Sequence, residues 1–88
     1  MSTSTADKNI DDTLDARGLS CPLPVLRARK TLKRMKAGQV LEILATDPGS
    51  LKDFVSFCAQ TGDELVSKAT EETPNGPLYR FHIRREGI

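Results

Sequence analysis

The sequence predicts an α/β (α+β) domain, a two-layer sandwich in which two helices cover one face of a four-stranded mixed sheet. Two segments, near residues 22–35 and 50–61, carry apolar residues at helical spacing. Short apolar or alternating runs, bounded by turn residues, lie before, between and after them and predict strands. The expected order is therefore β-α-β-α-β-β. A chain of 88 residues is long enough for one such domain with a modest core.

The first half of the chain is expected to form a strand, a helix and a second strand. A short strand covers residues 13–16. The helix begins at Pro22, because proline is favoured at the first helical position, and ends near Met35 with Gly38 beyond it as the stop. Residues 40–45 are apolar apart from Glu42, which predicts a largely buried strand parallel to the first. The apolar helix face consists of Val25, Ala28, Leu32 and Met35.

The second half is expected to form a helix and a hairpin. After the turn at residues 47–49, Ser50 is a suitable N-cap with Asp53 as its reciprocal partner, and Gly62 ends the helix. A strand over residues 64–70 and a turn at 73–77 follow. The last strand, residues 78–84, alternates, so one of its faces should be buried and the other open to water. Core candidates in this half are Leu51, Phe54, Val55, Phe57, Cys58, Tyr79, Phe81 and Ile83.

Composition limits the functional classes. Hydrophobic residues make up 38% and charged residues 28%, as in folded globular domains. No apolar run approaches the roughly 20 residues that span a bilayer, and the first residues lack the apolar segment of a secretory signal. We therefore expect a cytoplasmic domain over residues 12–86, with a disordered tail at 1–11 and a short end at 87–88.

The inventory of reactive side chains is small. The chain has two cysteines and one histidine. Because Cys21 and Cys58 are far apart and form no paired cluster, we expect neither a zinc site nor a disulfide. Cys58 lies on the apolar face of its helix and should be core. His82 should be a solvated residue on the open sheet face.

The motif Cys21-Pro22-Leu23-Pro24 is the most informative local feature. It predicts that Cys21 is the N-cap of the first helix, where the helix dipole favours thiolate over thiol. The expected pKa of Cys21 is therefore below about 8.5. Since neither proline has an amide hydrogen, Leu23 N–H should be the single backbone donor to the sulfur. The alternative reading is a rigid helix start with no reactive role.

Basic residues are concentrated around this motif. Seven of the 13 lysines and arginines lie between positions 17 and 41, a stretch with no acidic residue, although the net charge is only +1. Arg27, Lys30 and Arg34 fall on the exposed helix face, and Arg17 precedes the motif. Such a patch is either a solvated face or a surface that attracts acidic partners.

Three stretches of the chain, residues 14–24, 45–49 and 78–85, resemble the TusA (SirA-like) sulfur-carrier family. The likeness covers residues 13–86, and its most specific part is Leu14-Asp15-Ala16-Arg17-Gly18-Leu19-Ser20-Cys21-Pro22-Leu23-Pro24. It implies a fold like the C-terminal domain of translation initiation factor three. It also implies that Cys21 is the persulfide-forming nucleophile, with Gly18, Pro22, Leu23 and Pro24 as supporting motif residues.

The resemblance further implies a sulfurtransferase. If the thiol is already ionised, the exchange needs no metal or cofactor, and a transient partner surface indicates a monomer. The donor would be a cysteine desulfurase, and the acceptor a downstream sulfur-relay protein that serves 2-thiolation of the tRNA wobble uridine. Other relatives serve dissimilatory sulfur oxidation or molybdenum-cofactor assembly, so these pathways stay open. Neither membrane nor direct nucleic-acid binding is expected. The competing hypotheses are an RNA-binding module and a regulatory interaction domain.

Overall fold

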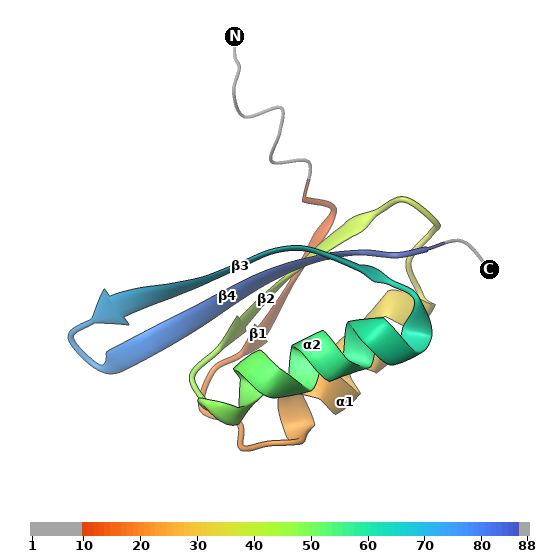
Figure 1. Ribbon diagram of the computed structural model, residues 1–88. Helices are drawn as coiled ribbons and strands as arrows, with labels where there is room; N and C mark the ends of the chain where they lie inside the picture. The colour runs from red at the N-terminus through yellow and green to blue at the C-terminus, as the bar shows by residue number, and fades with distance from the viewer. Residues whose placement is uncertain (1–9, 87–88) are drawn as a thin grey trace, which may run out of the picture.

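The computed structural model describes residues 10–86 and contains the predicted order of elements. Strands β1 (Asp12–Ala16), β2 (Val40–Ala45), β3 (Glu64–Thr73) and β4 (Gly76–Arg84) form one sheet in the order β1-β2-β4-β3. Only β1 and β2 pair in parallel. Helices α1 (Leu23–Lys33) and α2 (Gly49–Thr61) cover the same face of the sheet (Figure 1). The predicted two-layer α+β fold is confirmed.

Between the sheet and the helices lies a single apolar core. Phe54 of α2 packs against Phe81 of β4 with ring centroids 4.6 Å apart, and both side chains are fully buried. The predicted core is largely correct, although Val25, Met35 and Leu51 are only partly buried. Val55 is an exception at 43% exposed, because Phe54, Phe57 and Cys58 form the buried face of α2. The buried apolar residues are Ala16, Ala28, Leu32, Leu41, Ile43, Ala45, Phe54, Phe57, Cys58, Tyr79, Phe81 and Ile83.

The hairpin is longer than its sequence pattern predicts. Strand β3 continues to Thr73 and β4 begins at Gly76, so only Pro74 and Asn75 lie between them. The turn end of the hairpin extends past both helices (Figure 1), which is why most of β3 is exposed on both faces. An edge strand without a buried face carries no apolar alternation, and its extent is therefore hidden in the sequence.

A network of polar side chains covers the open face of the sheet. Arg80 of β4 bonds to Glu42 of β2 and to Glu71 of β3, both at 2.8 Å. His82 is more than a solvated residue, since its ring lies 3.1 Å from Glu42 and 3.0 Å from the Ser67 hydroxyl. Burial alone would raise the pKa of Glu42, but the bonds from His82 and Arg80 outweigh it and hold the pKa below its ordinary value.

The parallel pair β1 and β2 positions the candidate site. Because parallel strands end at the same edge of a sheet, the loop from β1 to α1 and the loop from β2 to α2 lie side by side (Figure 1). Cys21 is in the first loop and Asp47 in the second. At the other end of β2, Asp11 bonds to Val40 through both its backbone and its carboxylate. Of the predicted tail at 1–11, residues 1–9 lie outside the described residues, as does the predicted end at 87–88, whereas Asp11 is bonded to β2.

No helix within residues 10–86 is long and apolar enough to cross a membrane.

Candidate functional site at Cys21

Cys21 is exposed in the turn that leads into α1, but it is not the N-cap of that helix. The cap is Pro22, and the peptide bond between the two residues is cis. The Leu23 N–H that was predicted to donate to the sulfur donates instead to the carbonyl oxygen of Ser20, at 2.8 Å. The N-cap prediction is therefore wrong by one residue. A backbone turn satisfies the first helical amide before the cysteine side chain can compete for it.

The partner of the Cys21 sulfur comes from the other helix. The thiol donates to Asp53 Oδ2 over an Sγ–Oδ2 distance of 2.5 Å, a short contact. Asp53 belongs to the first part of α2, 32 positions further along the chain. A Cβ atom on Gly49 would lie 3.7 Å from Sγ, so the start of α2 passes directly beside the sulfur.

Two carboxylates control the ionisation of Cys21. The hydrogen bond to Asp53 raises the pKa of the Cys21 thiol, and desolvation and the charges of Asp53 and Asp47 act in the same direction. The predicted lowering of the pKa is therefore wrong. Cys21 lies one residue outside the N-cap of α1, and the charges that act on its thiol, those of Asp53 and Asp47, are negative. Since its pKa is raised, Cys21 is a neutral thiol at neutral pH.

The contacts of Asp53 and Asp47 with Cys21 are not visible in the local sequence pattern. That pattern predicts a capping pair of Ser50 and Asp53, whereas the helix is capped at Pro48 and the Ser50 hydroxyl is buried without a partner among the described residues. A usable signal was present. The turn at 47–49 follows a strand parallel to the one that precedes Cys21, and such loops meet at one sheet edge.

The supporting motif residues divide into buried and exposed positions. Pro24 is fully buried and anchors α1, whereas Leu23, two residues after Cys21, is 43% exposed. Gly18 has a φ of 82°, a left-handed conformation that favours glycine. Its N–H donates to Thr46 Oγ1 at 2.9 Å and thereby ties the two loops together.

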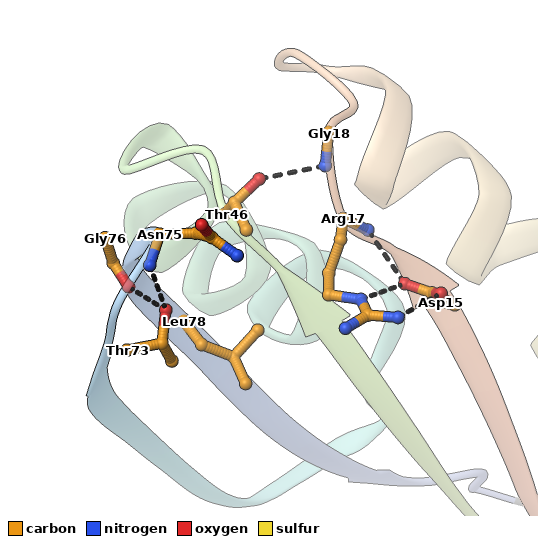
Figure 2. A pocket seen from close by; sticks show the side chains of 8 residues that line it. All are labelled: Asp15, Arg17, Gly18, Thr46, Thr73, Asn75, Gly76 and Leu78. Carbon is orange, nitrogen blue, oxygen red and sulfur yellow. Dashed lines mark hydrogen bonds and ion pairs between the residues drawn. The ribbon is translucent and has the colours of Figure 1, made fainter.

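Arg17 is not directed toward Cys21. Its guanidinium forms two bonds to Asp15, at 2.8 and 2.9 Å, and these hold the pKa of that carboxyl at about 2. Figure 2 shows this pair at one side of an open pocket of about 610 Å³, with the hairpin turn at the other side. The pocket residues are Asp15, Arg17, Gly18, Thr46, Thr73, Asn75, Gly76 and Leu78, and Cys21 is not among them.

The basic residues of α1 form a continuous exposed stripe. Arg27, Lys30 and Arg34 line one open groove on the helix, as their spacing predicts. Within residues 10–86 none of the three forms an ion pair. Leu23 and Leu26, 43% and 53% exposed, lie on the same helix. Together these five side chains, called here the α1 surface, begin two residues after Cys21.

The remaining reactive side chains lie apart from this site. Cys58 is 7% exposed in the core, as predicted, and desolvation followed by the charge of Asp63 raises its pKa to about 11. His82 belongs to the network on the open sheet face. Within the described part of the chain, no group of three or more His, Cys, Asp or Glu side chains is arranged to hold a metal ion.

Comparison with known proteins gives concordant results. The profile of the family described as "Sulfurtransferase TusA" matches residues 12–85. The "Sulfur carrier protein TusA" of Allochromatium vinosum is 52% identical over 77 residues, which cover 88% of this chain and 96% of that protein. The crystal structure of a SirA-like protein from Desulfitobacterium hafniense superposes with a TM-score of 0.63 at 28% identity, covering 83% of this chain and 96% of the other.

Proposed function

This chain belongs to the TusA family of sulfur carriers, and on that premise we propose that it carries a sulfane sulfur as a persulfide on Cys21. The observation that supports this role is the position of the sulfur. Cys21 is exposed at the edge of the sheet, in the Cys-Pro-x-Pro motif, where the active site of another protein can reach it. Cys58 has no such access, because it is buried in the core.

Sulfur acceptance is an exchange between two thiols with no net oxidation. The Cys21 sulfur attacks the outer sulfur of a donor persulfide, a new S–S bond forms, and the S–S bond of the donor breaks. The inner sulfur of the donor persulfide leaves as a thiolate and takes up a proton. Cys21 then holds the persulfide, and delivery is the same exchange in reverse with the acceptor's thiol. Neither a metal nor an organic cofactor enters the balance.

The proposed place of the chain is in a cytoplasmic relay. A cysteine desulfurase supplies the sulfur, and a downstream relay protein receives it for 2-thiolation of the tRNA wobble uridine. The carrier works as a monomer of one domain, residues 12–86, because each exchange requires the face around Cys21 to be free. The protein partners supply the enclosing walls that a domain of this size lacks.

The α1 surface is the proposed docking site for these partners. Its free arginine and lysine side chains attract acidic surfaces, and Leu23 and Leu26 add apolar area next to the sulfur. Arg17 contributes less, because Asp15 neutralises it. Reversing two charges with Arg27→Glu and Lys30→Glu should slow sulfur acceptance from a desulfurase by roughly 10-fold or more at low salt. Acceptance from a small persulfide donor should be unchanged.

The test of the function is sulfur loading followed by intact mass spectrometry. The protein is mixed with a cysteine desulfurase and L-cysteine, and the wild type should gain one sulfur atom that a reducing agent removes. The Cys21→Ser variant should gain none, whereas the matched Cys58→Ser variant should load like the wild type. Wild type without added sulfur, or equal loading of Cys21→Ser, contradicts the proposal. Salt-sensitive RNA binding in either case would favour the RNA-binding module.

A further inference from the structure

Asp53 accepts the hydrogen bond of the Cys21 thiol, and we infer that it is a catalytic residue of sulfur acceptance, the group that takes this proton as the sulfur attacks. The inference rests on the proposed function and adds a residue to it. It starts from the contact between Cys21 Sγ and Asp53 Oδ2, 2.5 Å long, in which the thiol is the donor. The proton therefore already points at the oxygen that would receive it.

The surroundings of the sulfur make Asp53 the natural acceptor. Two charged groups act on the Cys21 thiol, Asp53 and Asp47, and both are acidic. Asp47 is engaged elsewhere, since its Oδ2 accepts the Gly49 N–H at 3.1 Å. Asp53 is half-buried in a regular helical turn, which fixes its backbone relative to the sulfur. One carboxylate thus contacts the reacting atom, and the other acts on it only through its charge.

The Asp53 carboxylate that stabilises the protonated Cys21 thiol can also activate it for attack. A thiol is a poor nucleophile and a thiolate a good one, so an attacking Cys21 must lose its proton. In the proposed step the proton moves from Sγ to Asp53 Oδ2 while the new S–S bond forms on Sγ. The S–S bond of the donor breaks, and its thiolate leaves with the electron pair. Asp53 then gives the proton to that thiolate and returns to its starting state.

This arrangement has a characteristic dependence on pH. Proton transfer within the pair leaves its total number of protons unchanged, so the acceptance rate of the wild type should not rise with pH until the thiol itself ionises. Without the carboxylate, Cys21 must lose its proton to solvent first. The rate should then rise about tenfold for each pH unit below the thiol pKa, because it follows the thiolate fraction.

The experiment compares the wild type, Asp53→Asn and Asp47→Asn with glutathione persulfide as a small donor that needs no docking surface. The rate of sulfur gain on Cys21 is followed by mass spectrometry from pH 5.5 to 9. The ratio of wild-type rate to Asp53→Asn rate cancels the ionisation of the donor and should fall about tenfold per pH unit below the thiol pKa of the variant. Asp47→Asn is the matched control, and its ratio to the wild type should stay nearly constant below neutral pH.

A second readout does not depend on sulfur carriage. Iodoacetamide alkylation of Cys21 against pH should reach its midpoint at lower pH in Asp53→Asn than in the wild type, because the hydrogen bond and charge that retain the proton are gone. Asp53→Ser should repeat both results if the asparagine variant is poorly folded. A constant rate ratio, or an unchanged alkylation midpoint, overturns the role of Asp53. A wild type that gains no sulfur overturns the proposed function as well, so the two failures are distinguishable.

Discussion

Both cysteine thiols of this chain have a raised pKa, but the main physical cause differs between them. Cys58 is in the core, and desolvation is the main cause of its raised pKa of about 11. Cys21 is exposed, and its pKa is raised first by a hydrogen bond to Asp53. A buried thiol reaches water only when the protein unfolds, whereas a hydrogen-bonded thiol can transfer its proton to the acceptor in the folded protein. A raised pKa therefore accompanies an unreactive thiol at Cys58, whereas at Cys21 it accompanies a thiol whose proton has an acceptor in Asp53.

The largest expected difference between the two cysteines is in their rates of alkylation in the native protein. With its pKa raised from 9.0 to about 11, Cys58 has roughly 100-fold less thiolate than an ordinary thiol at the same pH, and its burial slows the reaction further. Iodoacetamide at pH 8 should therefore modify Cys21 alone, with Cys58 following only after addition of denaturant. Equal labelling of both residues in the native protein, read from peptide masses, would refute the assignment of Cys58 to the core.

The same substitution at both positions should have different effects on stability. Cys58→Ser places an unpaired hydroxyl in the core and should lower the free energy of unfolding by about 1–3 kcal/mol. Cys21→Ser keeps a donor for Asp53 at an exposed site and should change it by less than about 0.5 kcal/mol. Urea denaturation measures both values. A destabilising Cys21→Ser would mean that the Cys21–Asp53 contact is structural rather than chemical.

A smaller loss than that of Cys58→Ser is expected from a substitution on the opposite face of the sheet. Glu42→Gln removes a carboxylate bonded to Arg80 and His82 and should cost about 1 kcal/mol at neutral pH. Since the folded pKa of Glu42 is below its ordinary 4.5, its contribution is present above pH 4.5 and is lost as pH falls through the lowered value. The free energy of unfolding should therefore fall less steeply at acid pH in Glu42→Gln than in the wild type, while alkylation of both cysteines stays unchanged. A shifted Cys21 midpoint would show that the two faces are coupled.

Most of the fold could be predicted from local patterns, because each buried element has a periodic apolar face. The alternation of Tyr79, Phe81 and Ile83 and the helical spacing of Ala28 and Leu32 reflect burial against the same core. Patterns fail where burial is absent. The outer half of β3 extends past the helices, and residues 71–73 have no face to protect.

The exposed motif cysteine of the proposed site was predictable from the sequence, but its surroundings were not. Cys21 is identified by a motif in its own neighbourhood. Asp53 becomes its partner only because β1 and β2 run in parallel and bring two loops together. Local rules assigned each of these residues to the nearest helix end. The cap of α1 was instead taken by Pro22, and the cap of α2 by Pro48. Long-range pairing therefore determines the chemistry of this sulfur.

The most direct test of Cys21 as the sulfur carrier is to locate the added sulfur within the chain. Trypsin cleaves after Arg17, Arg27, Lys52 and Lys68, so the two cysteines fall in separate peptides, residues 18–27 and 53–68. After loading by a cysteine desulfurase and capping of the persulfide with iodoacetamide, the extra sulfur should appear on the Cys21 peptide alone. Extra sulfur on the Cys58 peptide, or on neither, would contradict the account.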